Sequence, residues 1–150
     1  MLDKRKILLI GSSGQIGSSV ESLIKGSHEL VILNRPTFDF TRKEELKNLI
    51  LKINPCIIVN AAAYTSVDLA EQETHLALTC NQEAPKLLAQ ISSSINALLI
   101  HFSTDYVFDG EHNQPYNEHD ITAPINIYGK TKLEGENAML SINPKGAIIR

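Results

Sequence analysis

The sequence is poor in several residue types, and each shortage narrows the kinds of protein it can be. Its 150 residues contain two cysteines, no tryptophan, four tyrosines and four phenylalanines. A chain of this length buries roughly 68–70% of the surface that it exposes when unfolded, so it needs neither disulfides nor a structural metal to fold. We therefore expect one domain over residues 1–150, with Cys56 and Cys80 as reduced core residues of a cytoplasmic protein.

Clustered positive charge and long apolar runs are also missing. Seventeen acidic residues against fourteen lysines and arginines give a net charge of −3, which argues against nucleic acid as a partner. No apolar run approaches the ~20 residues of a membrane span. The basic start, residues 1–6, has no signal-peptide apolar region, because Ile7–Ile10 runs directly into glycine. We expect no membrane partner either.

Short β-branched runs alternate with helical patterns, which is typical of βαβ units around a parallel sheet. The runs Ile57-Ile58-Val59 and Leu98-Leu99-Ile100 are apolar throughout, which predicts strands buried on both faces. The predicted fold class is therefore α/β, a doubly wound parallel sheet of Rossmann type. The expected strands are Lys6–Ile10, Leu30–Leu33, a short piece near Phe38–Phe40, Cys56–Asn60, Ala97–Ser103 and Ala147–Arg150.

Helical periodicity predicts the segments between these strands. Thr41-Arg42-Lys43-Glu44 has the spacing of a capping box and precedes a helix that stops before Pro55. A long helix runs from about Thr74 to Ile91, with Leu76 and Cys80 on its buried face. The next helix begins near Ile127, after a polar loop over Asp109–Asn126.

A glycine loop comes directly after the first strand. The segment Gly11-Ser12-Ser13-Gly14-Gln15-Ile16-Gly17 leaves a buried strand and opens a helix, whose bare N–H groups and positive end suit a pyrophosphate. Gly11 permits the tight turn, Gly14 the approach of the phosphates, and Gly17 the packing of the helix on the sheet. A dinucleotide site is thus predicted, and a merely flexible connection is the weaker alternative.

The end of the second strand bears on which coenzyme is bound. Asn34 stands where a carboxylate commonly binds the ribose 2′-hydroxyl of NAD, and Arg35 beside it could pair with a 2′-phosphate. This favours NADPH over NADH, with a solvated arginine as the alternative. Asp39 and Phe40 could hydrogen-bond and cover the adenine, although an ordinary turn would also favour an aspartate there.

Tyr128 and Lys132 are spaced i, i+4 and so lie on one helix face. A tyrosine that exchanges a proton near neutral pH benefits from a pKa below its ordinary value of about 10, and a nearby ammonium together with the charge of a nicotinamide can lower it. The pair therefore predicts proton transfer to or from a carbonyl group. An exposed amphipathic helix start would also explain the spacing.

Four blocks of sequence together resemble the extended short-chain dehydrogenase/reductases. They are GSSGQIG from Gly11, VNAAAYTSVDLAE from Val59, STDYVFDG from Ser103 and PINIYGKTKLEGE from Pro124. The resemblance implies NAD(P)H-dependent reduction of the 4-keto group of a dTDP-linked hexulose, a nucleotide-sugar used for surface polysaccharides. The family also has a smaller substrate domain, which we expect this chain to lack. Cofactor binding should then survive without turnover, and the uncovered sheet edge should allow a homodimer or aggregates.

The resemblance also implies a role for each matching residue. Thr104 would bind the substrate carbonyl, Tyr128 would donate the proton, and Lys132 would hold the nicotinamide ribose. Asp105 would contact the sugar. The cofactor-binding residues that the resemblance implies are Gly11, Gly14, Gln15, Ile16, Gly17, Asn34, Arg35, Asp39, Phe40, Ala61, Ala62, Ala63, Tyr64, Thr65, Phe102, Tyr128 and Lys132.

Asn81 matches the helix asparagine with which this family holds a proton-relay water, and it counts as catalytic on that ground. Because Pro85 has no N–H, the Asn81 carbonyl loses its helical partner and is free to accept from that water. A kink that improves packing is an equally weighted explanation. Some family members use magnesium, but the sequence offers no set of ligands that we can assign to a metal.

Related activities differ in the two residues directly after Thr104. Sugar 4,6-dehydratases would place Asp-Glu there, whereas this chain has Asp105-Tyr106, which favours carbonyl reduction. A different class of protein, the NADP-binding regulatory β subunit of methionine adenosyltransferase, resembles the same family and needs no turnover. The presence of Thr104, Tyr128 and Lys132 together favours an enzyme over that subunit. An inactive fragment of a reductase is the other alternative.

Overall fold

Five parallel strands make up the sheet in the computed structural model, which describes residues 5–150. The order is β2-β1-β3-β4-β5, so the direction of winding reverses between β1 and β3. Residues 1–4, part of the start that we judged unlike a signal peptide, lie outside the described residues. The strands are β1 (Lys6–Ile10), β2 (Glu29–Leu33), β3 (Ile57–Asn60), β4 (Leu98–Phe102) and β5 (Ala147–Ile149).

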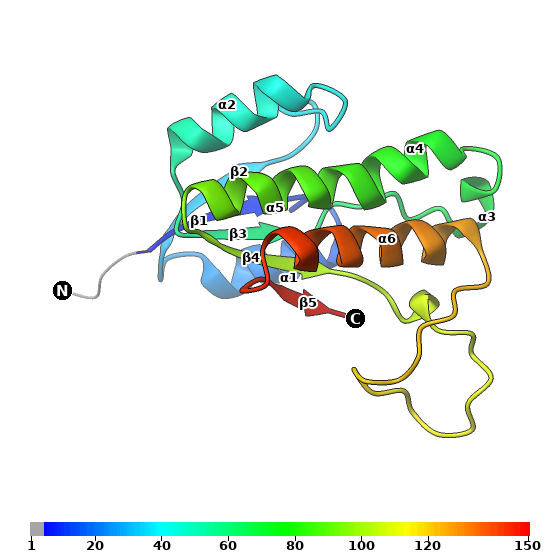
Figure 1. Ribbon diagram of the computed structural model, residues 1–150. Coiled ribbons are helices and arrows are strands. Elements are labelled where there is room, and N and C mark those ends of the chain that lie inside the picture. Colours follow the sequence, from blue (N-terminus) through cyan, green and yellow to red (C-terminus); the bar gives the residue numbers. More distant parts are fainter. Residues whose placement is uncertain (1–4) are drawn as a thin grey trace.

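Helices cover both faces of this sheet, which confirms the doubly wound α/β fold (Figure 1). Helix α1 lies behind the sheet, while α2, α5 and α6 lie in front of it. The helical elements are α1 (Gln15–Ile24), α2 (Lys43–Ile53), α3 (Val67–Ala70), α4 (Thr74–Leu78), the π-helical turn η1 (Thr79–Glu83), α5 (Ala84–Ser94), the 3-10 turn η2 (Asp105–Val107) and α6 (Ile127–Ile142).

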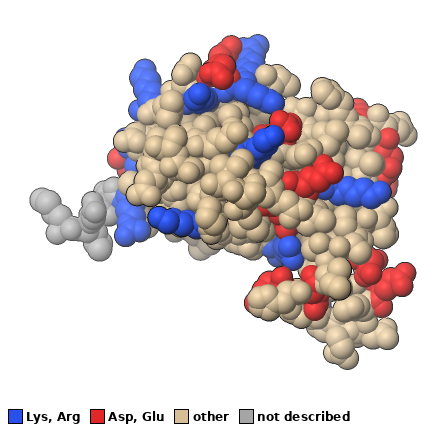
Figure 2. All heavy atoms as spheres, viewed as in Figure 1, with Lys and Arg blue, Asp and Glu red and all other residues tan. Residues whose placement is uncertain are grey.

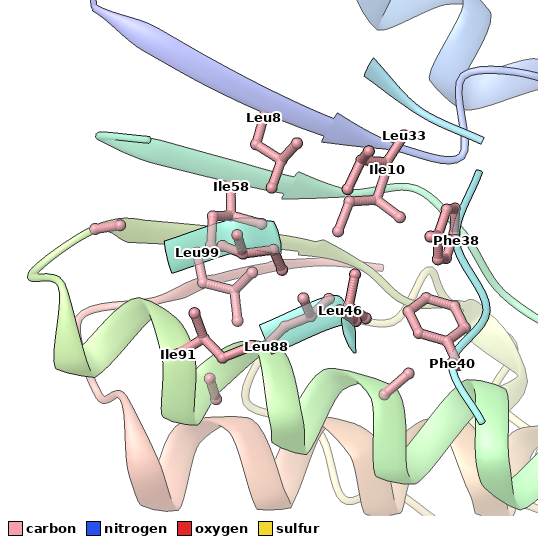
Figure 3. Close-up of a cluster of buried hydrophobic side chains, with 14 of the residues drawn as sticks. Leu8, Ile10, Leu33, Phe38, Phe40, Leu46, Ile58, Leu88, Ile91 and Leu99 are labelled. Atoms are coloured by element: carbon pink, nitrogen blue, oxygen red, sulfur yellow. The ribbon is translucent and has the colours of Figure 1, made fainter. Parts of the chain in front are cut away.

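The larger core cluster lies between the sheet and the front helices (Figure 3). Alternate residues of the strands, such as Leu8, Ile58 and Leu99, point toward Leu88 and Ile91 of α5. Burial of such side chains on one face supplies most of the hydrophobic driving force for docking the helices. Core formation thereby fixes the carboxyl ends of the strands, where ligands bind in open α/β sheets.

The prediction that the run Leu98-Leu99-Ile100 is buried on both faces is wrong for this strand, β4. Leu98 is 38% exposed and Ile100 is half-buried, whereas Leu99 between them is fully buried. The cause is the uneven cover of the sheet. On the rear face, Val20 and Ile24 of α1 pack against a small cluster centred on β1, which leaves β4 partly open.

No strand forms near Phe38–Phe40, which corrects a second prediction. The two rings are buried and pack edge to face, with centroids 5.0 Å apart, at the end of the core (Figure 3). An apolar-polar-apolar triplet has the period of a strand. Here the same period arises because Phe38 and Phe40 turn inward on either side of an exposed Asp39.

The predicted capping box before α2 is also absent. The residue that precedes the helix is Arg42, and its side chain makes no capping bond. Asp39 instead accepts a hydrogen bond from the Thr41 N–H at 2.9 Å, and this bond holds the pKa of its carboxyl below the usual value. Asp39 therefore forms the turn that the sequence left as the alternative to adenine binding.

The prediction that both cysteines are reduced core residues is confirmed for Cys80 and wrong for the position of Cys56. Both thiols are free, but Cys80 is buried whereas Cys56 is exposed, because β3 begins one residue later, at Ile57. The charged side chains on the face shown in Figure 2 lie separately or in small groups, and lysines and arginines form no continuous band there. In the described residues, no helix is long and apolar enough to cross a membrane.

Candidate active site

A groove of about 400 Å³ lies at the carboxyl ends of β1 and β3, where the winding reverses. Gly11 forms its base with φ +89°, and a Cβ on that residue would lie 2.7 Å from the backbone nitrogen of Ala62. Only glycine lets these two loops approach so closely. The groove brings together ten of the residues predicted to bind cofactor, namely Gly11, Gly14, Asn34, Arg35, Phe40, Ala61, Ala62, Ala63, Tyr64 and Thr65.

Helix α1 begins at the edge of this groove without a side-chain cap or an acidic residue in its first turn. Its first main-chain bond runs from Ser18 to Gly14, so the N–H groups of residues 15–17 have no helical partner. The amide of Asn34 holds the loop in place, since it donates to Ser12 Oγ at 2.8 Å and accepts from Ser13 N–H at 3.3 Å. The loop therefore offers a preformed anion site.

Some predicted residues lie beside the groove rather than in it. Gln15 and Ile16 are exposed on the first turn of α1, and Asp39 lines an adjoining pocket of about 630 Å³. Arg35 lines both spaces. Sequence reasoning missed Ser13, Phe38, Ser66, Leu76 and Cys80 as further lining residues.

The helical pattern of α4 does not show whether an apolar residue lines the groove or packs in the core. The pattern predicts Leu76 on the buried face of its helix, but Leu76 is 37% exposed and lines the groove. Cys80 lies one turn further along and is buried, as predicted. The i, i+4 spacing of Leu76 and Cys80 could have indicated that both line the same groove, because residues four apart lie on one side of a helix.

Thr104 and Tyr128 come together beyond the end of β4. Thr104 caps η2, where its hydroxyl accepts from Tyr106 N–H at 3.2 Å and donates to Asp105 at 3.3 Å. Tyr128, which is 8% exposed, stands on the first turn of α6, where Asn126 caps the helix by accepting from the Gly129 N–H. The ring of Tyr106, two residues after Thr104, packs against the Tyr128 ring with the centroids 5.5 Å apart, which places Tyr128 beside the Thr104 turn.

The protein groups by themselves raise the pKa of Tyr128, and a lowering by Lys132 together with the nicotinamide charge stays a prediction. Burial raises this pKa above the ordinary tyrosine value, and the nearby Asp105 and Tyr106 raise it further, whereas the Thr104 hydroxyl lowers it. Burial has the largest effect and outweighs the Thr104 hydroxyl, because the buried phenolate would lose most of its hydration. Tyr128 thus remains protonated at neutral pH and is set up to donate a proton.

Lys132 lies one turn beyond Tyr128 and is 1% exposed. Its ammonium donates to the main-chain carbonyl of Phe102 at 2.6 Å, which ties α6 to the end of β4. Burial lowers the pKa of Lys132 to about 8, against the opposing field of Glu136. The predicted Tyr128 and Lys132 pair therefore lies on one helix beside β4, as the spacing required.

Asn81 is fully buried and its side chain joins three segments. The amide accepts from Tyr64 N–H at 2.9 Å and donates to Tyr64 O at 3.1 Å and to Thr131 Oγ1 at 3.3 Å. The main-chain carbonyl of Asn81 lies against α6, where a Cβ on Gly135 would be 2.0 Å from the carbonyl oxygen. These contacts support the packing explanation of the π turn before Pro85, and the water-holding role stays a prediction.

His101 is a buried residue of the site region that sequence reasoning passed over. Asn60 accepts from Ala62 N–H with its carbonyl oxygen, so its amide NH₂ donates to His101 Nδ1 at 3.0 Å. The imidazole therefore carries its proton on Nε2, which has no partner among the described residues. Burial, together with the charge of Lys132, lowers the pKa of His101 to about 3.

This histidine predicts a loss of stability in acid. An unfolded histidine binds a proton near pH 6.5, whereas folded His101 does not until about pH 3, so its contribution is complete above pH 6.5 and falls below it. The loss is about 1.4 kcal/mol per pH unit, or about 2 kcal/mol by pH 5. Urea unfolding at pH 7 and pH 5 measures it.

A His101→Gln variant should lose about 2 kcal/mol less than the wild type between these two pH values. The matched control is His75→Gln at an exposed position, which should follow the wild type. If His101→Gln and the wild type lose equal stability, His101 is not the neutral buried group described above.

In the described residues, no group of three or more His, Cys, Asp or Glu is placed to hold a metal ion. The fold is a doubly wound sheet of the Rossmann class, with a groove where the winding reverses and a threonine, a tyrosine and a lysine beyond the carboxyl end of β4. Residues 5–150 match the family described as RmlD substrate binding domain, and the chain belongs to that family.

Curated relatives agree with this assignment. The chain is 40% identical to the dTDP-4-dehydrorhamnose reductase of Aggregatibacter actinomycetemcomitans, over 97% of this chain and 50% of that protein. It is 38% identical to the enzyme of the same name from Escherichia coli, over 96% of this chain and 50% of that protein. The chain spans about half the length of these curated relatives.

A solved structure gives the same match. The dTDP-4-dehydrorhamnose reductase of Bacillus anthracis in complex with NADP superposes with a TM-score of 0.96 at 32% identity, covering 100% of this chain and 54% of that one.

Proposed function

We propose that this chain binds NADP(H) and supplies the catalytic residues for reduction of the 4-keto group of dTDP-4-dehydrorhamnose. The observation that carries the proposal is the packing of Tyr128 against η2, the turn that Thr104 caps beyond the end of β4, with the buried Lys132 one turn further along α6. The names of the curated relatives support the same reaction. The reaction would take place in the cytoplasm, and a homodimer remains part of the proposal.

The residues present fit a dinucleotide. The open N–H groups of α1 and the absence of a side chain at Gly14 suit the pyrophosphate, and the alanines after β3 leave room for the ribose and nicotinamide. The NADP complex of the Bacillus anthracis relative supports this choice of cofactor. When bound, the nicotinamide supplies the hydride that reduces the keto carbon.

The side chains of this chain would handle the oxygen and its proton. Thr104 would donate a hydrogen bond to the keto oxygen, and Tyr128 would transfer its phenolic proton to the same oxygen as charge develops there. Lys132 would hold the ribose hydroxyls and stabilise the resulting phenolate. Asp105 is exposed next to Thr104 and would contact the sugar.

A reductase assay separates this function from that of a non-catalytic NADP-binding subunit. The chain is fused to the half of the Aggregatibacter actinomycetemcomitans reductase that it does not match, and the loss of NADPH absorbance is followed with dTDP-4-dehydrorhamnose present. We expect turnover of about 1 s⁻¹ or more. NADPH binding without turnover would favour the non-catalytic subunit, and no binding would refute both.

Coenzyme preference should depend on Arg35. A charge-assisted bond to a 2′-phosphate contributes about 1.5–3 kcal/mol, so Arg35→Ala should weaken NADPH binding about 10- to 100-fold and leave NADH binding unchanged. Calorimetry with both coenzymes measures this ratio. The control is Arg42→Ala, since Arg42 lines only the adjoining pocket and lies 3.6 Å from Glu45. If Arg42→Ala changes the ratio and Arg35→Ala does not, the assignment of Arg35 is wrong.

A further inference from the structure

A row of buried polar side chains lies between α6 and the ends of β4 and β5. Glu136 is 1% exposed and stands one helical turn after Lys132, so both side chains lie on the same face of α6. The hydroxyl of Ser103 donates a hydrogen bond to the Glu136 carboxylate. On the other side, Arg150 approaches both carboxylate oxygens, with Nη2 at 2.7 Å and Nε at 3.2 Å.

These contacts give the buried Glu136 carboxylate a partner on each side. The Arg150 guanidinium pairs with both of its oxygens, which is the strong, forked form of an ion pair. Arg150 is in turn held by the ring of Phe108, with its guanidinium carbon 5.2 Å from the ring centroid. The negative charge of Glu136 is therefore fixed in place from two strand ends.

Lys132 is the neighbour with most to gain from that charge. Its ammonium has three donors and is bonded to the Phe102 carbonyl, and its burial favours the neutral amine. The charges that face it differ in sign and strength. His101 approaches from β4 but is neutral, Tyr128 on the same helix is protonated, and Glu136 is the group that favours the ammonium.

We propose that Glu136, held by Arg150 and Ser103, is a positioning residue that keeps the side chain of Lys132 charged and aimed at the end of β4. This role in a reductive site rests on the proposed function. The effect of Glu136 on the ammonium is a property of the chain itself, and it can be measured without cofactor or substrate.

Side-chain NMR of the ligand-free chain tests the proposal through the titration midpoint of Lys132. An opposite charge nearby shifts a pKa by about 1–3 units, so Glu136→Gln should lower the Lys132 midpoint by about one pH unit or more. The matched control is Glu134→Gln, because Glu134 lies on the same helix and is exposed. This control should leave the midpoint where it is in the wild type.

A second variant covers the case in which Glu136→Gln fails to fold. Glu136→Gln combined with Arg150→Gln removes both partners of the ion pair and leaves no unpaired guanidinium, so it should fold and should also lower the Lys132 midpoint. An unchanged midpoint in either folded variant would overturn the proposal. Absence of reductase turnover in the fused wild-type protein would refute the proposed function alone, since the titration involves neither substrate nor hydride transfer.

Discussion

Replacing Tyr128 by phenylalanine in the fused protein is expected to lower turnover of the keto sugar by about 10²- to 10⁴-fold, which is the usual contribution of general acid catalysis. NADPH affinity should hardly change, because phenylalanine keeps the ring and its packing. The proton donor acts in the transition state, so its loss should appear in kcat rather than in binding. Stopped-flow absorbance with saturating NADPH measures the rate.

The matched control for this experiment is Tyr106→Phe. The Tyr106 ring packs edge to face with that of Tyr128, with centroids 5.5 Å apart, but Tyr106 is 45% exposed and lies on η2. Loss of its hydroxyl should leave the rate near that of the wild type. A Tyr128→Phe protein that retains most of its rate would show that another group donates the proton.

Valine in place of Gly14 is expected to weaken NADPH binding by on the order of 100-fold or more, equivalent to about 2.7 kcal/mol. A Cβ at this position would meet nothing closer than the Gly11 carbonyl oxygen at 3.7 Å, so the fold itself tolerates a side chain. Because Gly14 is exposed on the loop, the new side chain would occupy the space of the phosphates instead. Calorimetry measures the affinity, and thermal unfolding verifies the fold.

Gly17 provides the contrast within the same loop. A Cβ there would lie 2.1 Å from the Gly11 carbonyl oxygen, so Gly17→Val should lower the melting temperature strongly. Gly14→Val and Gly17→Val should therefore separate binding from folding. Wild-type affinity in Gly14→Val would mean that the pyrophosphate does not use this loop.

Periodicity predicted the sheet and its winding because buried parallel strands and amphipathic helices leave clear patterns. It failed where a pattern has two physical origins. Phe38 and Phe40 alternate with a polar residue as a strand would, yet they anchor a turn in the core. Cys56 is apolar by type, but it lies outside β3 and is exposed. No local signal in the sequence distinguishes this exposed cysteine from a buried one.

The glycine groove could be predicted because its chemistry is local in sequence, whereas the support of Lys132 could not. Glu136 lies in a charged stretch of α6 that has the composition of a solvated helix face. It is buried and pairs with Arg150, fourteen residues later, at the end of β5. His101 likewise depends on Asn60, 41 residues earlier on the neighbouring strand. Such pairings arise from the order of the strands, which local sequence patterns do not encode.

The most direct test of dinucleotide binding is a titration of the isotope-labelled chain with NADP⁺, monitored by amide chemical shifts. We predict saturable shifts that begin in the Gly11–Gly17 loop, continue through Ala61–Thr65 and reach Phe102, Thr104 and Tyr128. That set traces one dinucleotide from its pyrophosphate to its nicotinamide. Shifts confined to other surfaces, or none at millimolar NADP⁺, a concentration at which even weak ligands of about −4 kcal/mol bind, would contradict the proposed site.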